Sequence, residues 1–195
     1  MTKIKKVAIF GGTFDPIHRG HIYLAEQIIK AGEFDQLVIV PAGQPWQRPT
    51  IASAEHRLAM VRLAFESNDV IVSDCEVLRT KPSYAIDTVR ELMKQDSEAR
   101  FSWIIGSDAL NGLESWHQIS ELSELVDFIV ITRPGYEISA THIPSYIRWR
   151  SREFGALDLS GTDIRRALHE RRDVSAMITP SVLAYIKENH LYGAA

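Results

Sequence analysis

The residues best suited to chemistry stand together in one glycine-rich segment near the N-terminus, Gly11–His21, which reads GGTFDPIHRGH. Its two glycines leave room for the backbone to approach a ligand closely, because neither carries a side chain. Asp15 and Pro16 form a turn signal that predicts the start of a helix. His18 and His21 are three residues apart, so both would face the same side of that helix's first turn. Unpaired N–H groups and the helix dipole attract anions there, and two imidazoles can add hydrogen bonds, so the segment predicts a phosphate-binding site.

Two other interpretations of these histidines are metal binding and a purely structural role. Metal binding would need a third Cys, His or carboxylate at a diagnostic spacing, and none stands at such a spacing from His18 and His21. We therefore expect no metal site built from this segment. A purely structural interpretation, in which both histidines pack at a helix start, is the remaining alternative.

A second segment of this kind, Leu159–Arg166, lies near the other end of the chain and reads LSGTDIRR. Ser160 followed by Asp163 three residues later resembles a capping box, which predicts a second helix start. The hydroxyls of Ser160 and Thr162, the exposed backbone amides and the Arg165 guanidinium would suit the oxygens of a triphosphate. Taken alone, the pattern favours a simple helix cap and a phosphate site equally.

These segments need elements that position them, and the chain alternates short apolar runs with helical patterns. The apolar runs are rich in Val, Ile, Phe or Trp and end near Gly, Pro, Asp or Ser. They predict strands at Val7–Phe10, Leu37–Val40, Val70–Ser73, Phe101–Ile105 and Phe128–Thr132. Helical spacing predicts helices at Gly20–Ala31, Ala54–Glu66, Tyr84–Gln95 and roughly Ser115–Leu125. The stretch Tyr136–Phe154 fits neither pattern.

Apolar strands that alternate with helices predict an α/β fold of the Rossmann-like, doubly wound type, with a parallel sheet covered on both faces. We expect a single domain over residues 1–195, because no linker, repeat or low-complexity tract divides the chain. Ligands of such sheets bind beyond the carboxyl ends of the strands. The chemistry is therefore expected just after Phe10, Val40, Ile105 and Thr132.

Composition excludes several classes of function. A formal net charge of -3 argues against coating nucleic acid or a membrane through bulk attraction. Cys75 is the sole cysteine, so an internal disulfide and a cysteine metal cage are both excluded. The basic start Met1–Lys6 leads into an apolar run too short for a signal peptide, and no segment has the roughly 20 apolar residues of a membrane span. The chain is therefore expected to work in the cytoplasm.

The segment GGTFDPIHRGH resembles the signature of the bacterial nicotinate-nucleotide adenylyltransferases, within the HxGH nucleotidyltransferase superfamily. The segment LSGTDIRR is similar to the family's Ile-Ser-Ser-Thr-x-Ile-Arg motif, with Gly161 in place of the second serine. The resemblance runs from about Lys6 to Tyr192. Class I aminoacyl-tRNA synthetases share the shorter His-x-Gly-His motif, but 195 residues leave no room for their tRNA-binding and editing domains.

Further segments match family positions that contact the two substrates. Gly106 and Asp108 match a Gly-x-Asp element on the adenosine side, and Trp116 matches the tryptophan that stacks on the pyridine ring. The resemblance implies that ATP is bound by Gly11, Gly12, Thr13, His18, His21, Gly106, Asp108, Arg133, Ser160, Thr162 and Arg165. It implies that the acceptor is bound by Thr13, Arg48, Tyr84, Ala85 and Trp116. The catalytic residues it implies are His18, His21 and Arg165.

Two acceptor-side positions depart from the family pattern. Gln47 stands where a histidine is usual, although the basic residue that follows is kept as Arg48. Ala85 stands where a threonine commonly helps to hold the nicotinate carboxylate. The backbone amides of Tyr84 and Ala85, at a predicted helix start, are left for that task.

The resemblance implies that the phosphate of nicotinate mononucleotide attacks the α-phosphorus of ATP, giving nicotinate adenine dinucleotide and pyrophosphate in NAD biosynthesis. A phosphate monoester is mostly dianionic at neutral pH, so the reaction needs no general base. Mg²⁺ is expected to arrive with ATP, because the sequence shows no dedicated carboxylate cage.

Several alternatives remain. Another phosphorylated acceptor, such as nicotinamide mononucleotide or phosphopantetheine, would use the same chemistry, and a non-catalytic nucleotide-binding domain would use the same motifs. An oxidoreductase is disfavoured, because Gly11–Phe14 is not the G-x-G-x-x-G dinucleotide fingerprint. We expect ATP and a mononucleotide as partners, with no nucleic acid and no membrane. A homo-oligomer is compatible with the sequence, which leaves the oligomeric state open.

Overall fold

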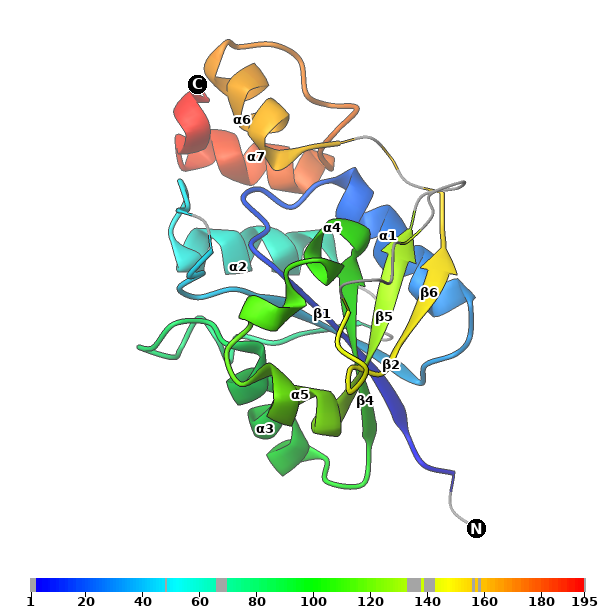
Figure 1. Cartoon of the computed structure of the whole chain (residues 1–195). Coiled ribbons are helices and arrows are strands. Elements are labelled where there is room, and N and C mark those ends of the chain that lie inside the picture. The colour runs from blue at the N-terminus through cyan, green and yellow to red at the C-terminus, as the bar shows by residue number, and fades with distance from the viewer. Residues whose placement is uncertain are drawn as a thin grey trace.

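A six-stranded parallel sheet forms the centre of the molecule (Figure 1). The computed structural model describes residues 3–47, 49–65, 70–132, 138, 143–155, 157 and 159–194. The strands are β1 (Lys6–Gly12), β2 (Gln36–Pro41), β3 (Val70–Val72), β4 (Arg100–Gly106), β5 (Val126–Thr132) and β6 (Trp149–Glu153). Their order across the sheet is β3-β2-β1-β4-β5-β6, the doubly wound arrangement in which ligands bind where the chain order reverses, between β1 and β4. The predicted fold class is confirmed.

Helices cover both faces of the sheet. The described α-helices are α1 (Arg19–Lys30), α2 (Ala54–Ala64), α3 (Ala85–Gln95), α4 (Ser107–Leu110), α5 (Ile119–Leu125), α6 (Gly161–His169) and α7 (Pro180–Glu188). Two short 3₁₀ turns are η1 (Leu113–Ser115) and η3 (Leu191–Gly193). None of the described helices is long and apolar enough to cross a membrane.

Alternating side chains of each strand divide the core into two layers, as the pleat of a strand requires. On β1, Ala8 and Phe10 belong to the cluster that includes α1, α2, α6 and α7. Val7 and Ile9 belong to the other cluster, with α3 and α5. Figure 1 shows α3 and α5 together on one side of the sheet. Because both faces are buried, the central strands read as continuous apolar runs, which is why they were predictable.

The five predicted strands and the predicted helices are present, but several boundaries and assignments differ. The helix predicted from Ser115 begins at Ile119, since Gln118 just before it is left-handed, with φ 51°. β6 lies within the unassigned stretch 136–154, because its sequence WRSRE is mostly polar and the strand pairs along one edge only. Neither α4 nor α7 was predicted. Ser160 is the N-cap of α6 but makes no side-chain cap hydrogen bond, and the Asp163 carboxylate accepts from Arg166 at 2.6 Å, so the predicted capping box is not formed.

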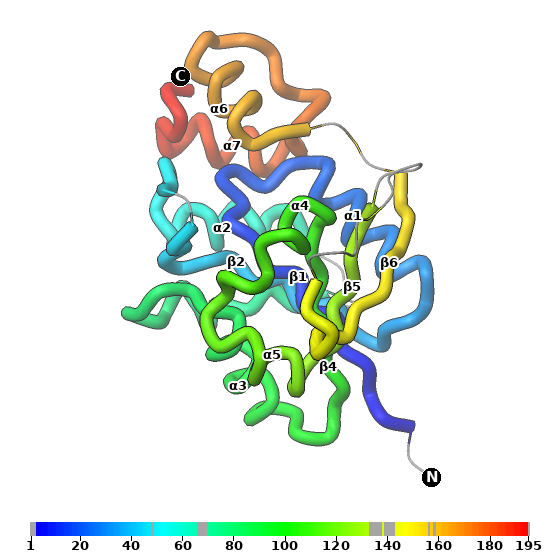
Figure 2. The backbone as a smooth tube through the Cα atoms, viewed as in Figure 1, coloured from blue at the N-terminus to red at the C-terminus, as the bar shows by residue number. Residues whose placement is uncertain are grey.

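The C-terminal segment of the chain packs against the histidine loop that follows β1. Figure 2 shows the C-terminal segment beside the loop that follows β1. The Tyr192 hydroxyl donates to the Asp15 carboxylate at 2.6 Å, across 177 positions of sequence. The C-terminal segment is therefore part of the scaffold that shapes the histidine loop.

Candidate active site

The loop after β1 places two imidazoles at the start of α1. His18 is the N-cap of that helix, and its backbone N–H donates to Nδ1 of His21 at 3.3 Å. The rings stack with centroids 3.7 Å apart. Since Nδ1 of His21 accepts this bond, the ring's proton lies on Nε2, which is left as a donor. Nδ1 of His18 is buried and has no hydrogen-bond partner in the described part of the chain.

Both imidazoles are neutral at pH 7. Burial lowers the pKa of His18 from 6.5 to about 4. Burial, and then the neighbouring His18, hold the pKa of His21 well below its usual value. Phe14 contributes to this apolar setting, because its ring stands edge-on to that of His21 at 5.0 Å. The histidines therefore offer neutral N–H donors, and any positive charge for a phosphate must come from other groups.

Arg165 supplies such a charge from the start of α6. Its Nη1 donates to the backbone carbonyl of Asp15 at 2.6 Å, and its Nη2 donates to the Thr162 hydroxyl at 3.2 Å. These bonds hold the second helix start against the histidine loop. Gly161 makes the approach close, since a Cβ added there would lie 3.1 Å from the same carbonyl oxygen of Asp15. This contact gives a physical reason for the glycine that replaces the family's second serine.

The two helix starts share one cavity, which we call the phosphate cavity, with a volume of about 870 Å³. Eight of the sequence-predicted residues line it: Thr13, His18, His21, Gly106, Asp108, Ser160, Thr162 and Arg165. The segments around residues 13–21, 106–108 and 160–165 are thus brought together from three parts of the chain. This arrangement suits a polyphosphate, because helix-start amides, neutral donors and one guanidinium face the same space.

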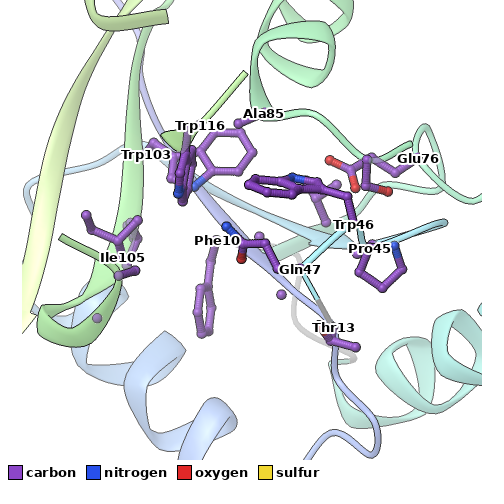
Figure 3. Close-up of a pocket in the computed structure, with 18 residues that line it drawn as sticks. Phe10, Thr13, Pro45, Trp46, Gln47, Glu76, Ala85, Trp103, Ile105 and Trp116 are labelled. Carbon is purple, nitrogen blue, oxygen red and sulfur yellow. The ribbon is translucent and has the colours of Figure 1, made fainter. Parts of the chain in front are cut away.

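A second, smaller cavity of about 260 Å³ adjoins the first and is walled by aromatic rings (Figure 3). We call it the aromatic cavity. Its walls include the predicted residues Gly11, Gly12, Thr13, Ala85 and Trp116. Thr13 and Gly106 line both cavities, so the two spaces meet at the ends of β1 and β4. A ligand that spans them would have its junction beside Thr13 and Gly106.

Trp116 packs against two core rings at the wall of the aromatic cavity. Its indole stands edge-on to Trp103 at 6.2 Å and to Phe128 at 6.3 Å, with interplanar angles of 87° and 81°. The side chain is half-buried, so one part packs on the core while another faces the cavity. Gly11 is required by the same packing, because a Cβ there would lie 2.8 Å from the Trp103 ring.

Three predicted acceptor or nucleotide contacts are not placed in these cavities. Tyr84 is the N-cap of α3 and does not line the aromatic cavity. Its backbone N–H donates to the Pro82 carbonyl at 3.0 Å, and its ring stacks on His117 at 4.2 Å. Of the two amides expected to serve the acceptor, that of Ala85 is therefore the one left without an intrahelical partner. Arg48 and Arg133 lie outside the described residues.

Sequence reasoning missed the buried groups that hold the site together. Arg57 is fully buried and donates to three carbonyls, those of Thr13 at 2.8 Å, Gly43 at 3.0 Å and Ala52 at 3.3 Å. It thereby ties the loop after β1 to the loop after β2. The Asp15 carboxylate accepts from the amides of residues 51 and 52, which fixes the same region from the other side. Only the arginine's position within an apolar helical pattern could have hinted at this role.

The aromatic cavity also holds residues that were not predicted as ligand contacts. Trp46 and Gln47, from the loop after β2, line it together with Glu76. Glu76 is buried, which raises the pKa of its carboxyl, and it accepts a hydrogen bond from the Thr88 hydroxyl at 2.5 Å. No Arg, Lys or His is among the described residues that line this cavity. Within residues 3–47, 49–65 and the later described ranges, no group of three or more His, Cys, Asp or Glu side chains could hold a metal ion.

Comparison with known proteins identifies the class. Residues 9–167 match the cytidylyltransferase-like family model, so the chain belongs to this nucleotidyltransferase family. At finer level it belongs to the nicotinate-nucleotide adenylyltransferases. It is 37% identical over 188 residues to a probable nicotinate-nucleotide adenylyltransferase of Leifsonia xyli, covering 96% of this chain and 94% of the relative. It is 34% identical over 192 residues to one from Oceanobacillus iheyensis, covering 97% and 98%.

A solved structure agrees on the fold. The nicotinic acid mononucleotide adenylyltransferase of Plasmodium falciparum, complexed with NaAD, aligns with a TM-score of 0.81. The alignment covers 98% of both chains at 20% sequence identity. At that identity the similarity supports the arrangement of helices and strands, while the family assignment rests on the sequence relatives.

Proposed function

We propose that this chain transfers the adenylyl group of ATP to the phosphate of nicotinate mononucleotide, giving nicotinate adenine dinucleotide and pyrophosphate. The observation that carries the proposal is the pair of adjoining cavities, one built for phosphates and one walled by aromatic rings, which meet beside Thr13 and Gly106. Adenylyl transfer needs such a junction, because the new bond forms between the phosphates of two nucleotides.

The ATP side of the proposal uses the phosphate cavity. His18 lies at the reacting phosphate, and its neutral ring donates as charge builds on the α-phosphoryl oxygens. His21, Ser160 and Thr162 steady the triphosphate, while Arg165 adds the permanent positive charge. Asp108 and Gly106 take the adenosine side. Gly11 and Gly12 act indirectly, since both line the aromatic cavity and allow the rings of Trp103 and Phe14 to pack close to the loop.

The acceptor side uses the aromatic cavity. Trp116 stacks on the pyridine ring, and the Ala85 amide at the start of α3 meets the carboxylate. Thr13, shared by both cavities, lies beside the acceptor phosphate. Arg48 remains part of the proposal as a cation for the acceptor phosphate, and Arg133 remains a contact on the nucleotide side. Both lie outside the described residues.

Catalysis in this proposal is positioning and charge stabilisation. The acceptor phosphate, with a second pKa of about 6, is already mostly dianionic at neutral pH and attacks without a general base. Attack on the α-phosphorus breaks its bond to the bridging oxygen, and pyrophosphate leaves with that electron pair. Mg²⁺ enters as part of the Mg·ATP substrate, where it neutralises phosphate charge.

The proposal includes one domain over residues 1–195, a cytoplasmic location, and no nucleic-acid or membrane partner. Two rival acceptors remain for the same site. Phosphopantetheine has no ring for Trp116 to meet, so the aromatic cavity favours a pyridine mononucleotide. Nicotinamide mononucleotide differs from the acid only at the group near Ala85. A non-catalytic binding domain is disfavoured, because His18, His21 and Arg165 converge on one cavity.

An acceptor panel tests the proposal. Pyrophosphate release from Mg·ATP is measured with nicotinate mononucleotide, nicotinamide mononucleotide, phosphopantetheine and no acceptor. We expect release to depend on a pyridine mononucleotide, with the highest kcat/KM for the acid. A higher kcat/KM for nicotinamide mononucleotide would make the amide the proposed acceptor. An absence of pyrophosphate release in all four reactions would refute the enzymatic proposal.

A further inference from the structure

The aromatic cavity contains two indoles whose environments differ sharply. Trp116 is backed by Trp103 and Phe128, as described above. Trp46, in contrast, is 45% exposed, and its ring lies 6.4 Å from that of Tyr84 in a tilted arrangement. Figure 3 shows Trp46 reaching into the same cavity as Trp116, between that residue and Glu76. A large apolar side chain therefore borders the cavity with nearly half of its surface open to water.

The loop that carries Trp46 is anchored by several contacts at its base, and these contacts place the indole at the cavity. Ala42 N–H donates to the Gly12 carbonyl at 2.9 Å, and Gln44 and Ser83 exchange hydrogen bonds at 2.9 and 3.1 Å. Gly43 lies so close to the next loop that a Cβ there would be 1.9 Å from the carbonyl oxygen of Glu76. These contacts tie the base of the loop to β1 and to the segment before α3.

The ligand expected at this cavity has the chemistry that such an indole recognises. The pyridine ring of a mononucleotide is flat, and its nitrogen is quaternary, so the ring carries a positive charge. An indole binds a flat ring through aromatic stacking and a positively charged ring through the cation–π interaction. No described Arg, Lys or His lines the cavity, and the one carboxyl in its wall is that of Glu76. The surroundings are therefore compatible with a cationic ring.

We propose that Trp46 is the second aromatic wall of the acceptor site, so that the pyridinium ring is held between indoles that follow β2 and β4. This inference rests on the proposed pyridine mononucleotide acceptor. It assigns a ligand contact to the loop after β2 and makes that loop a determinant of acceptor specificity. Trp46 recognises the cationic ring and not its substituent, so it contributes equally to binding of the acid and the amide.

The first experiment compares Trp46→Ala, Trp46→Phe and the matched control Ile71→Ala. Ile71 is 44% exposed on β3 and lines neither cavity, so it controls for loss of an exposed apolar side chain. We expect Trp46→Ala to raise the KM for nicotinate mononucleotide about tenfold and to leave the KM for ATP within about twofold. Trp46→Phe should recover most of this loss, and Ile71→Ala should behave as wild type. An unchanged acceptor KM, or equal rises for both substrates, would overturn the inference.

A second experiment tests the charge of the ring. Oxidised nicotinamide mononucleotide has a cationic ring, whereas its reduced form has a neutral dihydropyridine ring with the same amide. We expect wild type to bind the oxidised form more tightly in calorimetric titrations without ATP, and Trp46→Ala to narrow that preference. An unchanged preference would show that Trp46 does not meet the ring. Because these titrations need no turnover, they separate failure of this inference from failure of the proposed reaction.

Discussion

The phosphate cavity and the aromatic cavity are held in place by different forces. The phosphate cavity is fixed by hydrogen bonds between distant segments, such as those from Arg165 to Asp15 and from Tyr192 to Asp15. The aromatic cavity is fixed by ring packing, with Trp116 edge-on to Trp103 and Phe128. This difference indicates that the reaction of ATP depends on hydrogen-bond donors held in fixed positions in the phosphate cavity. The choice of acceptor depends instead on the apolar surfaces of the aromatic cavity, which changes in the loop after β2 can alter.

The two cavities also differ in charge. The phosphate cavity is lined by two neutral imidazoles, the Arg165 guanidinium and the carboxylates of Asp15 and Asp108, whereas the described lining of the aromatic cavity has a buried carboxyl and no cation. Substitutions should therefore separate the two substrates. Changes in the first cavity should lower kcat or ATP use, and changes in the second should raise the acceptor KM.

The largest effect is expected from His18→Ala. Removing one preorganised donor at developing charge typically lowers kcat by about 10²–10³. Steady-state kinetics, with circular dichroism and thermal unfolding as checks of the fold, measure this loss. Near-normal turnover in a folded variant would place the reacting phosphate away from His18.

The neutral histidines predict a loss of stability in acid. His18 has a folded-state pKa of about 4 against 6.5 for an ordinary histidine. Above pH 6.5 the ring is neutral in both states, but between 6.5 and about 4 only the unfolded chain binds the proton, so acid favours unfolding. The 2.5-unit difference corresponds to about 3 kcal/mol at the acid end of this range.

Urea unfolding of wild type and His18→Gln at pH 7 and pH 4.5 tests this sign. The free energy of unfolding should fall further in wild type, because the variant lacks the titrating ring. Equal losses in the two proteins would mean that His18 titrates normally in the folded state.

Arg165→Ala should weaken the use of ATP more than the use of the acceptor. Hydrogen bonds to charged groups contribute roughly 1.5–3 kcal/mol, which corresponds to a fall of about 10- to 100-fold in kcat/KM for ATP. Arg166→Ala is the matched control, since Arg166 pairs with Asp163 and lines neither cavity. If both variants keep normal ATP kinetics, Arg165 serves only to join α6 to the histidine loop.

The smallest effect is expected from Trp116→Ala, which should raise the acceptor KM about tenfold with ATP kinetics nearly unchanged. Each substrate is varied at saturating concentrations of the other. Equal effects on the KM for ATP and for the acceptor would mean that Trp116 supports the fold and does not bind the pyridine ring. The proposed separation of the two cavities would then be wrong for the acceptor.

Much of this organisation could be predicted from the sequence, because it depends on local signals. The glycine–histidine segment begins a helix, and the buried parallel strands are continuous apolar runs, so both the fold class and the position of His18 followed. β6 was missed because an edge strand with the sequence WRSRE does not need an apolar pattern. The roles of Arg57 and Tyr192 depend on contacts across more than 40 positions, which no local pattern encodes.

The loop after β2 illustrates the same limit on the acceptor side. Its Pro-rich sequence is compatible with irregular surface, and only the fold shows that Trp46 borders the cavity of Trp116. Tyr84 illustrates the reverse, since its motif position suggested an amide for the ligand but the structure pairs that amide with Pro82. Which amides are free depends on the local turn and not on the residue types.

Transfer of a labelled phosphate tests the central claim most directly. Wild type is incubated with nicotinate mononucleotide and Mg·ATP labelled either at the α- or at the γ-phosphate. The account predicts that the α-label appears in nicotinate adenine dinucleotide and the γ-label in pyrophosphate, in equal amounts and only when the mononucleotide is present. Release of the α-label as AMP, or of the γ-label as free phosphate without dinucleotide, would contradict adenylyl transfer between the two cavities.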